Sequence, residues 1–131
     1  VERVGLNDAL AVHRRVSDLI RKGTVAAAHD VSDGGLACAI AEMCIAGSCG
    51  ATIEWSSEKD VDSLFAEPGT TYLLEMSEAA ARASGFPVIG RVTAEPVLSI
   101  TSQHEGSAEW SIDELSRAWR TPLMPVSEGA R

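Results

Sequence analysis

Cysteine is scarce in this sequence, and its spacing argues against two common kinds of cysteine site. The 131 residues contain three cysteines, Cys38, Cys44 and Cys49, an odd number with no C-x-x-C pair. This pattern speaks against a disulfide framework and against a complete zinc site, and it fits a reducing compartment. On a helix, Cys38 and Cys44 would lie about 240° apart. We therefore expect these cysteines to be buried, and we assign them no chemistry.

Basic residues and long apolar runs are also scarce. Eleven Lys and Arg residues stand against 19 Asp and Glu residues, which gives a formal net charge of −8. Nucleic acids and anionic membranes are contacted first through basic side chains, so neither is expected as a partner. No apolar stretch approaches the roughly 20 residues that span a bilayer, and residues 1–4 lack the apolar region of a signal peptide. We therefore expect a cytoplasmic protein.

The rest of the composition is that of one ordinary globular domain. Hydrophobic residues make up 45% and charged residues 23% of the chain, both close to the average for soluble domains. A domain of this length buries roughly two thirds of its unfolded surface around one core. The chain starts without Met in a segment that heads into a helix. We therefore expect residues 1–122 to be one domain of a larger protein, and residues 123–131 to be a flexible tail.

Hydrophobic periodicity and capping residues predict interleaved helices and strands. Asn7 or Asp8 can cap the first helix, and Ser77 and the S-x-x-E capping box at Ser111 mark the starts of two later helices. The predicted helices are 7–22, 35–46, 77–84 and the segment after Ser111, with a helical turn at 60–65. The predicted strands are 24–28, 51–55, 70–76, 88–92, 97–101 and 108–110. This order favours an α+β fold with a mixed β-sheet covered by helices.

The junction between the first predicted strand and the second predicted helix carries the candidate site. If Gly35 opens that helix, the loop before it presents backbone N–H groups at the positive end of the helix dipole, and Gly34 and Gly35 leave room for an anion. Asp30 follows the strand, and Mg²⁺ typically binds one or two carboxylates together with nucleotide phosphates and water. Ser32 can donate a hydrogen bond to a phosphate oxygen. The loop can therefore hold phosphate and magnesium.

The same residues also have a purely structural interpretation. The sequence D-x-S-D-G-G is typical of turns. As the N-cap residue, Asp33 would accept a hydrogen bond from a backbone N–H of the first helical turn. Next to a bound phosphate, the Asp33 carboxylate would be repelled unless a metal ion lay between the two negative groups. The loop lacks the GK[ST] ending of a P-loop, and no GxGxxG follows a strand. We interpret His29 as a hydrogen-bonded histidine at the edge of the core, and His13 and His104 as structural or solvent-facing. Physical reasoning alone leaves both interpretations of the loop open.

The amino-acid sequence of this segment resembles that of one protein family. Residues 29–36 read HDVSDGGL and are followed by Ala41-Glu42-Met43, which is similar to the C-terminal domain of formylglycinamide ribonucleotide amidotransferase, also called phosphoribosylformylglycinamidine synthase. The similarity covers nearly the whole chain, including Ile89-Gly90-Arg91-Val92 and residues 115–119. The resemblance implies the fold of the C-terminal domain of aminoimidazole ribonucleotide synthetase. It also implies a part of an ATP-dependent ligase of purine biosynthesis (EC 6.3.5.3).

The resemblance further implies a reaction and a set of partners. The full enzyme would convert formylglycinamide ribonucleotide, glutamine and ATP to the amidine, ADP, phosphate and glutamate. Its catalytic residues would lie upstream, so no residue of this chain is expected to be catalytic and the isolated domain is expected to be inactive. The implied partners are an ATP-binding half and a catalytic domain pair in the same polypeptide, together with a glutaminase domain or subunit. Whether a small bridging subunit joins them stays open.

The resemblance also implies roles for residues of this chain, all of them at an auxiliary nucleotide site. The family has two pairs of domains, and this chain is similar to the last half of the second pair, which holds ATP or ADP with Mg²⁺. On that match Asp30 would ligate magnesium, and Ser32, with Asp33, Gly34 and Gly35, would contact the nucleotide. The implied role of this site is structural or regulatory.

One departure and two alternatives accompany this interpretation. Many relatives carry F-x-E-S-P-x-R, whereas this chain has Thr71 in place of the arginine, so any anion contact by that arginine is absent. Glu67 remains, either as a site carboxylate or as a solvated loop acid.

Two alternative functions stay open. The chain could belong to another ATP-dependent synthetase of the superfamily, of the hydrogenase maturation type, or it could be a stand-alone nucleotide-binding or scaffold module. We expect the isolated chain to self-associate or to be marginally stable, because a partner half would cover the apolar face of helix 35–46 and any exposed sheet edge.

Overall fold

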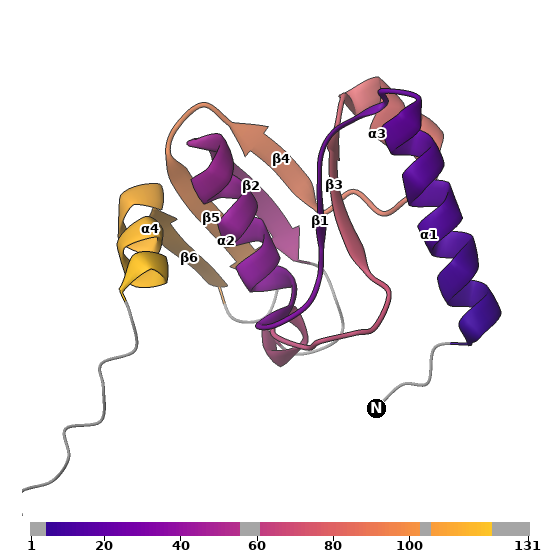
Figure 1. Ribbon diagram of the computed structural model, residues 1–131. Helices are drawn as coiled ribbons and strands as arrows, with labels where there is room; N and C mark the ends of the chain where they lie inside the picture. The colour runs from indigo at the N-terminus through magenta and orange to yellow at the C-terminus, as the bar shows by residue number, and fades with distance from the viewer. Residues whose placement is uncertain (1–4, 56–60, 103–105, 122–131) are drawn as a thin grey trace, which may run out of the picture.

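Figure 1 shows the computed structural model of the chain, which describes residues 5–55, 61–102 and 106–121. The tail expected at 123–131, the proposed boundary before it and His104 all lie outside the described residues. Among the helices that are described, none is long and apolar enough to cross a membrane.

Four strands form one mixed sheet in the order β4-β2-β5-β6. β2 runs parallel to β5, and the two outer pairings are antiparallel. The strands are β2 (Gly50–Trp55), β4 (Gly90–Thr93), β5 (Val97–Ser102) and β6 (Gly106–Ser111). Ala51 and Ile53 of β2 pair with Leu98 and Ile100 of β5, and all four are buried. Strand alternation therefore puts one apolar row on a single face, and the predicted mixed sheet is confirmed.

The strand that leads into the candidate site belongs to a separate ribbon. β1 (Val25–Asp30) pairs antiparallel with β3 (Tyr72–Met76). The strand predicted over 24–28 is present as β1, but it extends to Asp30 and alternates half-buried with exposed positions instead of being buried throughout. His29 consequently lies within the strand, opposite Leu73.

Two helices cover the apolar face of the four-stranded sheet. Figure 1 shows α2 (Gly35–Gly47) lying across the sheet, with α4 (Ile112–Arg120) beside it near β6. The capping box predicted at the start of α4 is confirmed, because the Ser111 hydroxyl accepts from the Glu114 amide at 3.2 Å and the Glu114 carboxylate accepts from the Ser111 amide at 3.0 Å. The shared core consists of Ile40, Cys44, Ala51, Ile53, Leu64, Leu98, Ile100 and Ile112.

The other two helices lie beyond the ribbon (Figure 1). α1 spans Leu6–Arg21 and α3 spans Glu78–Ser84, while a short 3-10 helix, η1, spans Val61–Leu64. The predicted caps of α3 are confirmed, with the Ser77 hydroxyl accepting from the Ala80 amide at 3.3 Å and Gly85 at φ 70°. Asn7 and Asp8 do not cap α1, which begins earlier with Gly5 as N-cap. Asp8 instead lies in the first turn, where its charge complements the helix dipole.

Exposed apolar side chains gather on α1 rather than on α2. Leu6, Leu10, Val12 and Ile20 are 38–85% exposed. Among the described residues, none of the large exposed apolar side chains belongs to α2. The expectation that helix 35–46 presents its apolar face to a partner is therefore wrong, because the sheet and α4 already cover it.

Candidate functional site

The candidate loop joins the end of β1 to the start of α2. Its first residue, Val31, is buried and donates its amide to the Thr71 carbonyl at 2.9 Å, which ties the loop to the chain just before β3. Ser32 and Asp33 follow and are exposed. Gly34 and Gly35 then take left-handed conformations, with φ of 79° and 70°, and α2 begins. The loop is thus anchored at both ends and open to solvent in the middle.

The amides of the two glycines are already hydrogen-bonded within the chain. The Gly34 amide donates to Glu67 Oε1 at 3.0 Å, and the Gly35 amide donates to the Ser32 carbonyl at 3.0 Å. The amides that the loop was expected to present to an anion thus already have acceptors within the chain. Glu67, which sequence reasoning left undecided, places its carboxylate where a helix N-terminus attracts an anion. A phosphate oxygen can take the Gly34 amide only if Glu67 leaves it.

The glycines also have a packing role that the sequence did not reveal. A Cβ on Gly35 would lie 2.6 Å from the Leu64 carbonyl oxygen, 2.6 Å from the Phe65 carbonyl carbon and 2.7 Å from the Ala66 carbonyl oxygen. The segment after η1 therefore packs directly on the first turn of α2. This close approach brings Glu67 to the loop and explains the need for glycine there beyond its left-handed φ.

The two aspartates of the loop differ from each other in position. Asp30 ends β1, and its side chain is 70% exposed. Asp33 is exposed but does not cap α2, because Gly34 is the N-cap residue and α2 has no side-chain cap bond. The N-cap interpretation of Asp33 is therefore wrong. An exposed carboxylate at the rigid end of a strand, with a serine two residues on, fits Mg²⁺ that takes its other ligands from phosphate and water. Among the described residues, no group of three or more His, Cys, Asp or Glu side chains could hold a metal ion unaided.

A second polar cluster lies next to this loop. His29 Nδ1 contacts the Asp30 carbonyl oxygen at 2.6 Å, and His29 Nε2 contacts Glu42 Oε2 at 3.1 Å. The other oxygen of Glu42 accepts a hydrogen bond from Trp119 Nε1 at 3.1 Å. One carboxylate thus joins β1, α2 and α4. The interpretation of His29 as a hydrogen-bonded, half-buried side chain is confirmed, and Glu42 is the residue that sequence reasoning missed.

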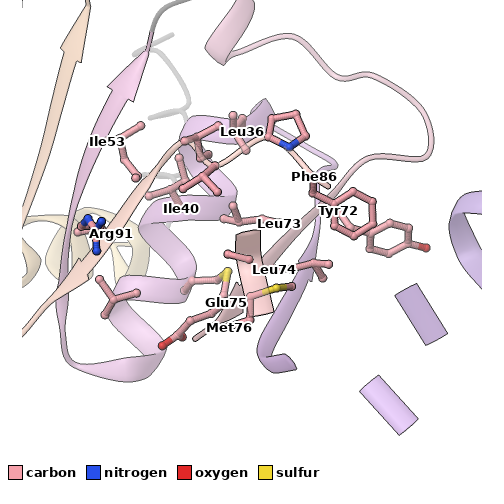
Figure 2. A pocket seen from close by; sticks show the side chains of 18 of the residues that line it. Leu36, Ile40, Ile53, Tyr72, Leu73, Leu74, Glu75, Met76, Phe86 and Arg91 are labelled. Atoms are coloured by element: carbon pink, nitrogen blue, oxygen red, sulfur yellow. The ribbon is translucent and has the colours of Figure 1, made fainter. Parts of the chain in front are cut away.

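A cavity of about 900 Å³ separates the ribbon from the four-stranded sheet. Figure 2 shows Leu36 and Ile40 of α2, Ile53 of β2 and Leu73 of β3 around it. Its walls are predominantly apolar, and Asp30, Ser32 and Asp33 are not among the described residues that line it. The cavity and the candidate loop are therefore distinct features.

Comparison with protein families gives one match. The family described as "AIR synthase related protein, C-terminal domain" matches residues 4–103. Among curated proteins, the phosphoribosylformylglycinamidine synthase subunit PurL of Thermus thermophilus is 33% identical over 97% of this chain and 18% of its own length. The same subunit of Rhodospirillum rubrum is 41% identical over 60% of this chain and 12% of its own length. The chain thus spans less than a fifth of these relatives.

Solved structures resemble the fold of this chain. A structure described as PurLQS from Thermotoga maritima superposes with a TM-score of 0.77 at 17% identity, covering 88% of this chain and 23% of that one. T. maritima PurL complexed with ADP gives a TM-score of 0.72 at 18% identity, with coverages of 83% and 21%. At these identities the likeness concerns the fold alone, and it confirms the expected α+β architecture.

Proposed function

Since the chain belongs to the family of AIR synthase related C-terminal domains, we propose that it is that domain of a larger ATP-dependent amidotransferase, phosphoribosylformylglycinamidine synthase. The observation that carries the proposal is the 33% identity with one PurL subunit over 97% of this chain. The HDVSDGG loop adds support, because it lies at a strand-to-helix junction whose Asp30, Ser32 and Asp33 face solvent. The complete protein would convert formylglycinamide ribonucleotide, glutamine and ATP to formylglycinamidine ribonucleotide in the cytoplasm.

This domain would supply half of an auxiliary nucleotide site. Asp30 would ligate Mg²⁺, Ser32 would donate to a nucleotide phosphate, and Asp33 with the two glycines would border the nucleotide. The metal ion would neutralise phosphate charge when bound. Because the Gly34 amide is held by Glu67 at 3.0 Å, nucleotide binding through that amide would release the Glu67 carboxylate. No residue of this chain is assigned to the reacting atoms.

The apolar surface of α1 supports a partner within the same polypeptide. Leu6, Leu10 and Ile20 are each more than 40% exposed, and apolar patches on a soluble domain mark interaction surfaces. We assign this surface to the ATP-binding half upstream. The isolated chain should then self-associate, and sedimentation of a stable monomer would contradict the assignment. A glutaminase domain or subunit would complete the enzyme by supplying ammonia.

The first test is the length of the native polypeptide in its source cells, detected with antibody to this domain. A band several-fold larger than 13.8 kDa is expected. A band near 13.8 kDa would contradict the proposal and favour a stand-alone nucleotide-binding or scaffold module.

The second test addresses the auxiliary site in the full-length protein. Asp30→Asn should lower the amount of nucleotide that stays bound through purification at least several-fold, with a smaller effect on turnover, because the site is not the catalytic one. Asp18→Asn is the matched control, since Asp18 is an exposed acid on α1 whose described partner is Arg21 at 3.4 Å. Equal nucleotide content in wild type and Asp30→Asn would remove Asp30 from the site. If the full-length protein instead phosphorylates a substrate other than formylglycinamide ribonucleotide, the chain belongs to another synthetase of the superfamily.

A further inference from the structure

The C-terminal end of α2 is built as a Schellman motif. The Ser48 amide donates to the Ile45 carbonyl at 3.3 Å, and the Cys49 amide donates to the Cys44 carbonyl at 3.2 Å. Between them Ser48 takes a left-handed conformation with φ of 50°. In this motif the side chains of the first and last residues typically make an apolar contact. Here those two residues are Cys44 and Cys49.

The same hydrogen bond limits the separation of the two cysteine backbones. With an N···O distance of 3.2 Å, standard bond lengths keep their Cα atoms within about 7 Å. Disulfides usually join Cα atoms about 4.4–6.8 Å apart. Cys44 is 4% exposed and Cys49 is half-buried, and both line the apolar cavity. The backbone geometry thus brings a buried thiol and a more accessible thiol together.

The third cysteine has a different environment. Cys38 lies near the opposite end of α2, with its Sγ in the space that a Cβ on Gly34 would need. It lies six positions before Cys44 on the helix, which puts the two side chains on different faces. The fold therefore selects one pair of cysteines out of three.

We propose that Cys44 and Cys49 are a redox modification site that forms a reversible disulfide at the end of α2. This inference goes beyond the proposed function and does not depend on it. Disulfides in reducing compartments are typically transient and redox-sensing rather than structural. The linkage would fix Ser48 in its left-handed conformation and hold the start of β2 against the last turn of α2.

A low-molecular-weight disulfide such as glutathione disulfide supplies the oxidant. The Cys49 thiolate attacks one sulfur of glutathione disulfide, forming a mixed disulfide and releasing one glutathione thiolate, which takes up a proton. Cys44 then loses its proton and attacks the Cys49 sulfur, releasing the second glutathione. Two protein thiols are oxidised and one glutathione disulfide is reduced to two thiols. Burial, with Cys49 and Glu75 adding smaller effects, raises the pKa of Cys44 to about 11, so the second step should accelerate as the pH rises.

The test is a thiol count on the reduced, folded chain after incubation with glutathione disulfide. Alkylation and intact mass should show one remaining thiol in wild type and none in Cys38→Ser, with no glutathione retained in either. Cys44→Ser should keep a glutathione adduct on Cys49, because the resolving thiol is gone. A lasting adduct on wild type, three alkylated thiols, or a linkage through Cys38 would each overturn the proposal.

Denaturant provides the control for the role of the fold. In the unfolded chain, Cys38–Cys44 and Cys44–Cys49 are separated by six and five positions, so their loop-closure costs are nearly equal. Both linkages should then form in comparable amounts. If the Cys44–Cys49 linkage dominates equally with and without denaturant, the sequence spacing and not the fold selects this pair, which would overturn the proposal.

Discussion

Replacing Gly35 by alanine tests how the segment after η1 is held on α2. Gly35 and Gly23 have nearly equal, left-handed φ angles of 70° and 67°. The cost of putting an L residue in this region is therefore the same at both positions, about 1 kcal/mol. A Cβ on Gly23 would meet no atom within 4 Å, so Gly23→Ala is a matched control that carries only the conformational cost.

The steric cost at Gly35 comes in addition. Its Cβ would lie 2.6–2.7 Å from three backbone atoms of residues 64–66, a separation that requires the segment to move. Leu64, which would move with it, is only 3% exposed and belongs to the core. Forcing an extra carbon into such a site costs about 1–3 kcal/mol. We therefore expect Gly35→Ala to lower the free energy of unfolding by about 2–4 kcal/mol, against about 1 kcal/mol for Gly23→Ala.

Urea unfolding followed by circular dichroism and tryptophan fluorescence measures both changes. Trp55 is a useful reporter, because its indole Nε1 donates to the Ser63 hydroxyl of η1 at 3.3 Å. Its emission should shift in Gly35→Ala and stay unchanged in Gly23→Ala. Equal loss of stability in the two variants would refute the argument that the 64–66 backbone packs on Gly35.

Three further changes test single contacts. Glu42→Ala should lower the free energy of unfolding by about 1 kcal/mol, because Trp119 loses its hydrogen-bond acceptor and His29 Nε2 loses its contact with the carboxylate. Urea unfolding checks this, and no change would mean that the cluster is not stabilising. Ser111→Ala should cost about 1 kcal/mol through the lost cap, and an unchanged urea midpoint would contradict the capping box. Hydrogen bonds from the Ser111 hydroxyl and amide lower the pKa of Glu114 below its usual 4.5. Wild type should therefore be more stable than Glu114→Gln above pH 4.5. This advantage should disappear as the pH falls through the lower pKa of Glu114 in the folded protein. A pH-independent difference in unfolding titrations would contradict this linkage.

Features encoded within a few residues could be predicted from the sequence. Ser77 and Gly85 delimit α3 as expected, and the Ser111–Glu114 capping box starts α4. The same holds for the alternation of β2 and β5, which fixes the buried face of the mixed sheet. Each of these signals depends on local backbone chemistry, so no knowledge of distant segments is needed.

Long-range pairings could not be predicted. The partner of the Gly34 amide is Glu67, which is 33 positions away, and nothing in either segment specifies the other. The separation of β1 and β3 from the main sheet depends on strand pairing, which is equally non-local. Glu42 did carry a signal, since it is the one charged residue of an otherwise apolar helix, and a buried or half-buried carboxylate needs a partner.

The most direct test of the proposed function is an activity measurement on the full-length polypeptide that contains this chain. With ammonia supplied in place of a glutaminase, we expect ADP formation that depends on formylglycinamide ribonucleotide. ADP formation that does not respond to formylglycinamide ribonucleotide, or no ADP formation by a folded full-length protein, would contradict the assignment to phosphoribosylformylglycinamidine synthase.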